Sequence, residues 1–158
     1  MTRAALTVLV LLLVVPAAAQ ATVVPQQGMK GARLGMTVDE VVDRVGEPTR
    51  STLVDHEIMG RVRELRYGLT VFTFNGRGET AELITTSTTS RSERLANDIG
   101  IGSTRAAVDR RVPRTRCRVE FGFDHCFIGT FRAGRVVTDF HISKAGRVKR
   151  IVVGRVID

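Results

Sequence analysis

A motif typical of the start of a helix occurs twice in this chain, and this repetition restricts the possible folds more than any other feature of the sequence. The segment LGMTVDEVVDRVGEPT begins at residue 34, and the similar segment IGSTRAAVDRRVPRT begins at residue 101. Internal repetition of this kind indicates that one supersecondary unit occurs twice. The sequence therefore predicts two similar halves.

The first copy reads as a short amphipathic helix with both ends marked. Thr37 can cap the N-terminus, and Glu40 can reach back to it, which makes a capping box. Four valines, at positions 38, 41, 42 and 45, follow at the spacing of one apolar helix face. Gly46 is suited to end the helix, and Pro48 prevents its continuation.

The second copy keeps only part of this pattern. Thr104 takes the cap position, and Val108 and Val112 retain part of the apolar stripe before Pro113. Ala107 stands where the first copy has the acidic residue of the capping box. We therefore expect the second helix to be the weaker one.

The similarity between the two copies continues beyond the helices. When the two copies are aligned without a gap, Phe72 meets Phe140 and Leu83 meets Ile151, so each half should end in a hairpin. An earlier strand is indicated by VRELRYG and by CFIGTFRAG, each followed by a turn. The predicted fold class is α+β, with two tandem repeats, each a short helix followed by about three antiparallel strands, and with the helices covering one face of the sheet. The predicted segments are a signal peptide at 1–21, a first repeat at 22–89, a polar linker at 90–97 and a second repeat at 98–158.

The N-terminal segment has the three parts of a secretory signal. A positive start at Arg3 precedes an apolar run, and small residues offer cleavage after Ala19 or Ala21. The apolar run is shorter than the roughly 20 residues of a membrane-spanning helix, and no cysteine near the cleavage site could carry a lipid. We therefore expect a soluble protein outside the cytoplasmic membrane that is not lipid-anchored.

Cys117 and Cys126 are the only cysteines, and in an oxidising compartment a disulfide between them is expected. A metal site made with His125 and His141 is the alternative, but adjacent His125 and Cys126 are poorly placed to chelate together. Thiol catalysis by the Asp124-His125-Cys126 segment would need a free thiolate and a third group to orient the histidine, which the sequence does not indicate. We predict no metal, no cofactor and no catalytic residues.

Positive charge is concentrated in the second half. Residues 31–97 carry nine Arg against ten Asp and Glu, whereas residues 98–158 carry eleven Arg and two Lys against six Asp and Glu. Such a field attracts anionic partners. Nucleic acid is disfavoured because the chain is exported and has no Trp and one Tyr for base stacking. An acidic protein or an anionic envelope component is the expected partner.

Gly100 to Arg105 begins like a dinucleotide fingerprint, but no βαβ unit surrounds it. The segment reads most simply as a turn and helix cap. Its backbone N–H groups, with Arg105, could hold one anion.

The element formed by Leu34-Gly35-Met36-Thr37, Glu40-Val41, Gly46 and Pro48 resembles the start of the SmpA/OmlA family of small outer-membrane assembly lipoproteins. Its duplication is similar to the tandem architecture of the β-lactamase inhibitor proteins. This resemblance implies helix-plus-sheet repeats and a sheet face that binds another protein. The anchoring cysteine of the lipoproteins is absent. The aromatic contact surface typical of the inhibitors is thin, because most of the seven Phe are expected in cores.

Taken together, these patterns predict a secreted, non-enzymatic, inhibitor-like binding module that uses the sheet face opposite the helices. Strand alternation directs Asp139 and His141 away from the core, onto a solvated face. An envelope structural protein that holds anionic lipid or wall polymer, and a hydrolytic or thiol-dependent enzyme, are the alternatives. The residues predicted to bind the partner are Val71, Thr73, Glu82, Arg116, Arg118, Asp139, His141, Arg150 and Val152.

Overall fold

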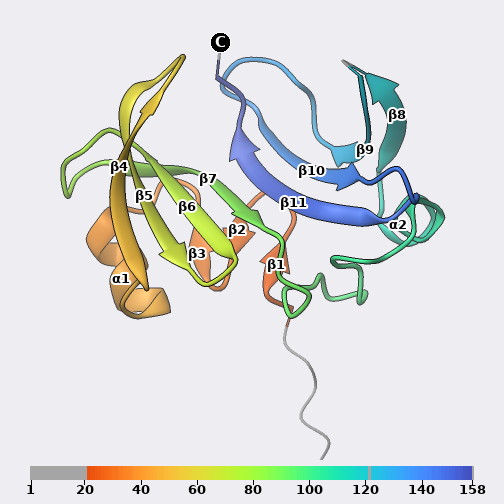
Figure 1. Cartoon of the computed structure of the whole chain (residues 1–158), viewed down its shortest axis with the longest axis horizontal. Helices are drawn as coiled ribbons and strands as arrows, with labels where there is room; N and C mark the ends of the chain where they lie inside the picture. The colour runs from red at the N-terminus through yellow and green to blue at the C-terminus, as the bar shows by residue number, and fades with distance from the viewer. Residues whose placement is uncertain (1–20, 121, 158) are drawn as a thin grey trace, which may run out of the picture.

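The computed structural model describes residues 21–120 and 122–157. An eight-stranded antiparallel sheet with the order β4-β5-β6-β7-β11-β10-β9-β8 dominates the fold (Figure 1). Its strands are β4 (Arg50–His56), β5 (Gly60–Tyr67), β6 (Thr70–Asn75), β7 (Glu82–Thr88), β8 (Arg116–Glu120), β9 (Phe123–Ile128), β10 (Val136–Ile142) and β11 (Val148–Arg155). A small sheet contains β1 (Val23–Val24), β2 (Gly28–Met29) and β3 (Ala32–Arg33), and the helices are α1 (Val38–Val45) and α2 (Arg105–Arg111).

The predicted fold class, two α+β repeats of one helix and about three strands, is wrong. Within the described residues the fold is mostly β, with two short helices against eleven strands, and the main sheet is continuous through β7 and β11. Four strands follow each helix. The sequence pattern did not reveal β4 and β8 because most of their residues are exposed, and a strand without a buried face needs no apolar alternation.

The three-stranded sheet was not predicted either. Its strands have two residues each, too few to show a period, and the turns between them place Gln26 and Lys30 at φ 58° and 52°. The sheet nevertheless supplies buried side chains from Val23, Met29 and Ala32. It packs through β2 against β7 and β11, the two strands at the centre of the large sheet.

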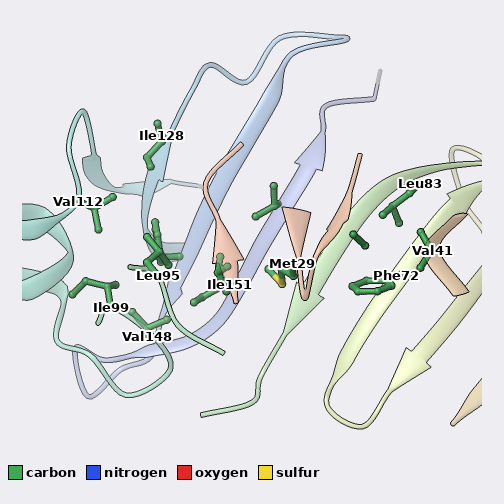
Figure 2. Packing of buried hydrophobic residues seen from close by; sticks show 14 of the residues in the cluster. Met29, Val41, Phe72, Leu83, Leu95, Ile99, Val112, Ile128, Val148 and Ile151 are labelled. Carbon is green, nitrogen blue, oxygen red and sulfur yellow. The ribbon is translucent and has the colours of Figure 1, made fainter. Parts of the chain in front are cut away.

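One hydrophobic core extends through both halves of the molecule (Figure 2). Phe72 on β6 and Phe140 on β10 are fully buried in it, and Met29 of the small sheet lies between the two halves. The valines of both helices and Leu95 join the same cluster. The chain therefore does not divide its apolar side chains between two separate cores, which is the physical reason that the expected pair of small units is replaced by one body.

The two similar helix starts dock in the same way. Gly35 N donates to the carbonyl of Leu83 and Gly102 N donates to the carbonyl of Val148, both at 2.8 Å. Leu83 N and Val148 N donate back to Met36 and Ser103. Leu83 thus corresponds to Val148 rather than to Ile151.

The offset comes from the hairpin turns. In the first hairpin Phe74 pairs with Leu83, and in the second Ile142 pairs with Val148. The second turn is therefore three residues shorter than the first, which a gap-free alignment could not show.

The helix ends agree with the sequence. Thr37 and Glu40 form the predicted capping box, and Val38 and Val41 are buried in α1. In α2 the Thr104 side chain accepts a hydrogen bond from Ala107 N, without an acidic partner. No helix among the residues described is long and apolar enough to cross a membrane. The predicted signal peptide lies, apart from Ala21, outside the described residues.

The segment predicted as a polar linker is packed against the small sheet. Glu93 and Leu95 are buried, and Glu93 forms an ion pair with Lys30 at 3.0 Å. The Arg94 carbonyl accepts hydrogen bonds from the backbone N–H groups of Thr22 and Val23, and Arg94 N donates to Thr22 Oγ1. This stretch therefore holds the small sheet beneath the large one.

Candidate partner-binding face

The helices and the small sheet cover one face of the large sheet (Figure 1). We call the opposite side the open face. Because directly paired residues in a sheet share a face, the strand register defines it. One row crosses all eight strands and consists of Arg50, Arg66, Val71, Ser87, Val152, Asp139, Phe127 and Arg116.

The register places most of the predicted partner-binding residues on this face. Val71, Asp139, Val152 and Arg116 belong to the row just defined. A neighbouring row joins Arg118, His125, His141 and Arg150 on β8, β9, β10 and β11. Thr73 lies on β6 opposite Thr85.

Glu82 lies apart from this group. It is exposed at the start of β7, where its neighbours are Asn75 and Thr37 rather than β11. A register shift after Thr73 places Thr85 opposite Thr73, and the intervening Ile84 is buried. No pattern in the sequence predicts this bulge.

The centre of the site is an aspartate held between two histidines. Asp139 Oδ1 lies 3.0 Å from His125 Nδ1, and Asp139 Oδ2 lies 3.1 Å from His141 Nε2. The contact with His125 is a hydrogen bond, and because a carboxylate only accepts, His125 Nδ1 is its donor. Asp139 is 6% exposed and His125 is 2% exposed, so the expectation of a solvated face at Asp139 is wrong. Asp139 is also the orienting partner of His125 that the sequence did not indicate.

Aromatic rings account for this burial. His125 has the rings of Phe123, Phe127 and Phe131 around it, with centroids 4.8, 5.1 and 5.8 Å away. The expectation that most phenylalanines lie in cores fails here, because these three gather on the open face. Phe123 is the first residue of β9, and Phe131 lies in the loop after β9. Strand alternation does not predict the position of that loop.

Two arginines lie over this aromatic group. The guanidinium carbons of Arg116 and Arg118 are 4.9 and 4.8 Å from the centroid of the Phe127 ring. Arg118 also forms an ion pair with Glu120 at 2.6 Å. Stacking on a ring holds a guanidinium in place. Arg116 also donates to the carbonyl of Gly129, so only the remaining N–H groups of the two arginines can meet a carboxylate.

Glu120 lies close to the outer nitrogen of the buried histidine. Its carboxylate is 3.7 Å from His125 Nε2, which is beyond a normal hydrogen bond. His125 Nε2 is buried and makes no hydrogen bond in the described part of the chain. A buried ring nitrogen left without a partner carries a desolvation cost. The hydrogen bonding of this cluster is therefore incomplete.

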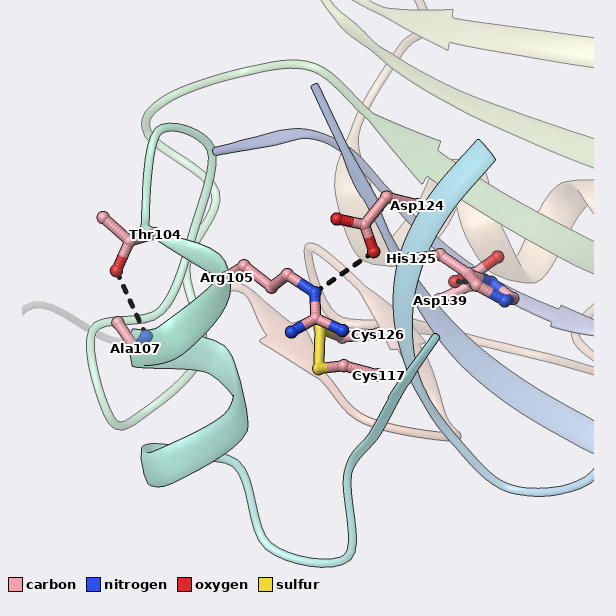
Figure 3. The surroundings of a disulfide bond; sticks show 8 residues. All are labelled: Thr104, Arg105, Ala107, Cys117, Asp124, His125, Cys126 and Asp139. Atoms are coloured by element: carbon pink, nitrogen blue, oxygen red, sulfur yellow. Dashed lines mark hydrogen bonds and ion pairs between the residues drawn. A yellow bond between two sulfur atoms is a disulfide. The ribbon is translucent and has the colours of Figure 1, made fainter. Parts of the chain in front are cut away.

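The predicted disulfide is present. Cys117 on β8 and Cys126 on β9 are directly opposed and bonded, and Figure 3 shows the bond beside Arg105 and Asp124. Their sulfurs are therefore not thiolates, which removes them as nucleophiles or metal ligands. Among the described residues, no group of three or more His, Cys, Asp or Glu side chains is placed to hold a metal ion.

The Arg105 side chain forms an ion pair within the protein, and this pairing competes with the binding of an anion. Its Nε lies 3.1 Å from Asp124 Oδ1, so the guanidinium ties the start of α2 to β9 (Figure 3). The helix that follows has seven residues. The anion site considered for Gly100 to Arg105 therefore loses the cationic side chain on which it depended.

Comparisons with known proteins identify no family for this chain. No family model matches it, and no curated protein matches it. Two solved structures are similar in shape. An extracellular protein containing a SCP domain from Bacillus anthracis has 8% identity and a TM-score of 0.48, over 77% of this chain and 44% of that one. A DUF4309 family protein from Bacillus subtilis has 12% identity and a TM-score of 0.49, over 87% of this chain and 90% of that one.

Proposed function

We propose that this protein is a non-enzymatic, extracytoplasmic binding module that receives an acidic protein on the open face of β8–β11. The observation that carries the proposal is the row formed by Arg118, His141 and Arg150 beside Arg116, all on one uncovered face. The three arginines are exposed and His141 is partly exposed. They belong to the half of the chain that holds the net positive charge.

An extracytoplasmic location fits two features of the chain. The sequence begins with the three parts of a secretory signal. The Cys117–Cys126 disulfide is a bond that persists in oxidising compartments and is rare where thiols are kept reduced. Both features support export, and neither indicates the partner.

A folded acidic protein fits the face better than a loose polyanion. Stacking over Phe127 fixes the guanidinium groups of Arg116 and Arg118, and fixed planar donors match carboxylates at defined positions. Phe131 remains 42% exposed beside them. Protein interfaces are enriched in arginine and in aromatic side chains of this kind.

The test begins with affinity capture from an extracytoplasmic fraction, with the mature chain as bait. The double variant Arg116→Glu/Arg150→Glu should then bind the captured partner more weakly, with a flatter dependence on salt. Arg50→Glu/Arg66→Glu is the matched control, because these residues share a row with Arg116 but lie in the other half of the sheet. Equal loss in both double variants, or none in either, would refute the assignment of this face.

The same face could instead hold anionic lipid or wall polymer, and a separate measurement distinguishes the two. Binding to a protein gives a complex of fixed stoichiometry. Binding to an envelope polymer gives co-sedimentation with purified wall or anionic vesicles, and release as salt is raised. Co-sedimentation without a stoichiometric protein complex would replace the acidic protein by the envelope material.

A further inference from the structure

The outer edge of β4 is an unpaired strand edge with an uncharged centre. β4 is the first strand of the large sheet, and within residues 21–120 and 122–157 it pairs only with β5, over all seven of its residues (Figure 1). Its central residues are Ser51, Thr52, Leu53 and Val54, and Leu53 and Val54 are 43% and 38% exposed. An exposed, regular edge with apolar side chains is a template for pairing with another strand.

The opposite edge of the sheet is protected in the ways that natural edges usually are. β8 has five residues, and three of them are charged, namely Arg116, Arg118 and Glu120. Charged side chains and a short length discourage strand addition. β4 has its charged residues only towards its ends, at Arg50 and Asp55.

The charge of the chain favours a second copy as the occupant of the β4 edge. The β4 edge belongs to residues 31–97, in which nine Arg are balanced by ten Asp and Glu. Two copies that meet there bring together nearly neutral halves. Two copies that meet at β8 would bring together the halves that carry thirteen Arg and Lys against six Asp and Glu, and these repel.

We propose that two copies of this chain associate through antiparallel pairing of their β4 strands about a two-fold axis at Leu53. This register is the one that pairs all seven residues of each strand. It places Leu53 against the Leu53 of the second copy, Thr52 against Val54, Ser51 against Asp55, and Arg50 against His56. No two carboxylates and no two arginines are then opposed, and paired residues keep the same face of the sheet.

The proposed strand pairing also determines how the other parts of the two copies are arranged. Because the axis is perpendicular to the sheet, the open faces of the two copies lie on the same side. The basic ends at β8 are then at the two far ends of one continuous sheet. A strand pair of seven residues spans about 24 Å, and its area falls below the roughly 1,200 Å² of a standard interface, so the dimer should be weak and depend on concentration.

Sedimentation equilibrium of the mature chain tests the association. The native chain should shift from monomer to dimer as its concentration rises, and Leu53→Lys should remain monomeric because it opposes two ammonium groups at the axis. Val119→Lys on β8 is the matched control, since Val119 is an exposed edge residue, 73% accessible, and this variant should dimerise like the native chain. A native chain that stays monomeric at all concentrations, or dimerisation lost only in Val119→Lys, would overturn the proposal.

Disulfide trapping tests the register even if Leu53→Lys folds poorly. Leu53→Cys should give a covalent dimer without reductant, because directly opposed side chains in an antiparallel pair have Cβ atoms about 5 Å apart. Thr52→Cys and Val54→Cys should each cross-link poorly alone and well when mixed. Efficient trapping of Val119→Cys, and none of Leu53→Cys, would contradict the β4 interface.

Discussion

The two halves of the open face have the same strand alternation, but their side chains differ in burial. In the row that crosses all strands, Arg50 and Arg66 of the first half are exposed, whereas Phe127 and Asp139 of the second half are buried. The register is regular through both. The difference arises because Phe131 folds over the second half and contacts Phe127, with ring centroids 5.0 Å apart. Burial on a sheet face is therefore decided by what covers the strand as much as by its alternation.

The largest loss of unfolding free energy is expected when an aromatic ring is removed from the core, and a smaller loss when one is removed from the open face. Phe72→Ala should lower the free energy of unfolding by about 4 kcal/mol, since Phe72 is fully enclosed in the main core. Phe127→Ala should cost about 2 kcal/mol, because Arg116, Arg118 and Phe131 can move into the space. Urea denaturation of both variants measures the difference. Equal losses would show that the open-face cluster is as rigid as the core.

The second prediction concerns Asp139. Asp139→Asn should lower the free energy of unfolding by about 2 kcal/mol, because the amide has one acceptor oxygen and no charge, so it cannot keep both the hydrogen bond with His125 and the ion-pair contact with His141. Val71→Asn places the same side chain in the same row of the first half, where Val71 is partly exposed, and should cost under about 0.5 kcal/mol. If the two variants lose the same stability, the aspartate is not the element that sets the halves apart.

The features that the sequence predicted are local ones. The capping box at Thr37, the valine stripe and the Cys117–Cys126 bond each depend on residues close in the chain. The fold class could not be derived in the same way, because β4 shows no apolar alternation and the small sheet around Met29 has strands of two residues.

The candidate site shows the same division. Strand alternation placed Asp139 and His141 on the correct side of the sheet, because a period of two needs only one strand. It could not show that Asp139 is buried, since that depends on His125 from β9 and on aromatic rings that other segments bring over it. The three-residue difference between the hairpin turns was hidden for a similar reason, because only the cross-strand partners reveal it.

The two helix starts should differ in the contribution of their caps. Thr37→Ala removes the acceptor of a capping box and should cost about 1 kcal/mol of unfolding free energy. Thr104→Ala removes a cap with no reciprocal acidic side chain and should cost about 0.5 kcal/mol. Thermal unfolding of the two variants side by side measures the order. A larger loss for Thr104→Ala would mean that docking on β11, and not the cap, determines helix stability.

The smallest effect concerns the end of α1, which is held by a tyrosine hydroxyl, whereas the end of α2 is held by Asn97 Nδ2, which donates to the carbonyl of Arg111 at 2.6 Å. Tyr67 Oη donates a hydrogen bond to the carbonyl of Gly46 at 2.8 Å, and its ring packs on Phe72 with centroids 5.2 Å apart. Burial, and secondly the carboxylate of Glu47, raise the pKa of Tyr67 above its ordinary value. The folded chain therefore holds the phenol proton more tightly than the unfolded chain does.

The sign of the pH dependence follows from that difference. The contribution of Tyr67 to stability is complete below its unfolded pKa of about 10 and is lost as pH rises through the higher folded value. Tyr67→Phe should lack this alkaline step, so the stability difference between native chain and variant should shrink above about pH 10. Since the chain has one Tyr and no Trp, the near-ultraviolet absorbance of the phenolate follows the same titration directly. An onset of phenolate absorbance at or below the value of a free tyrosine would contradict the raised pKa of Tyr67 and the alkaline step that follows from it.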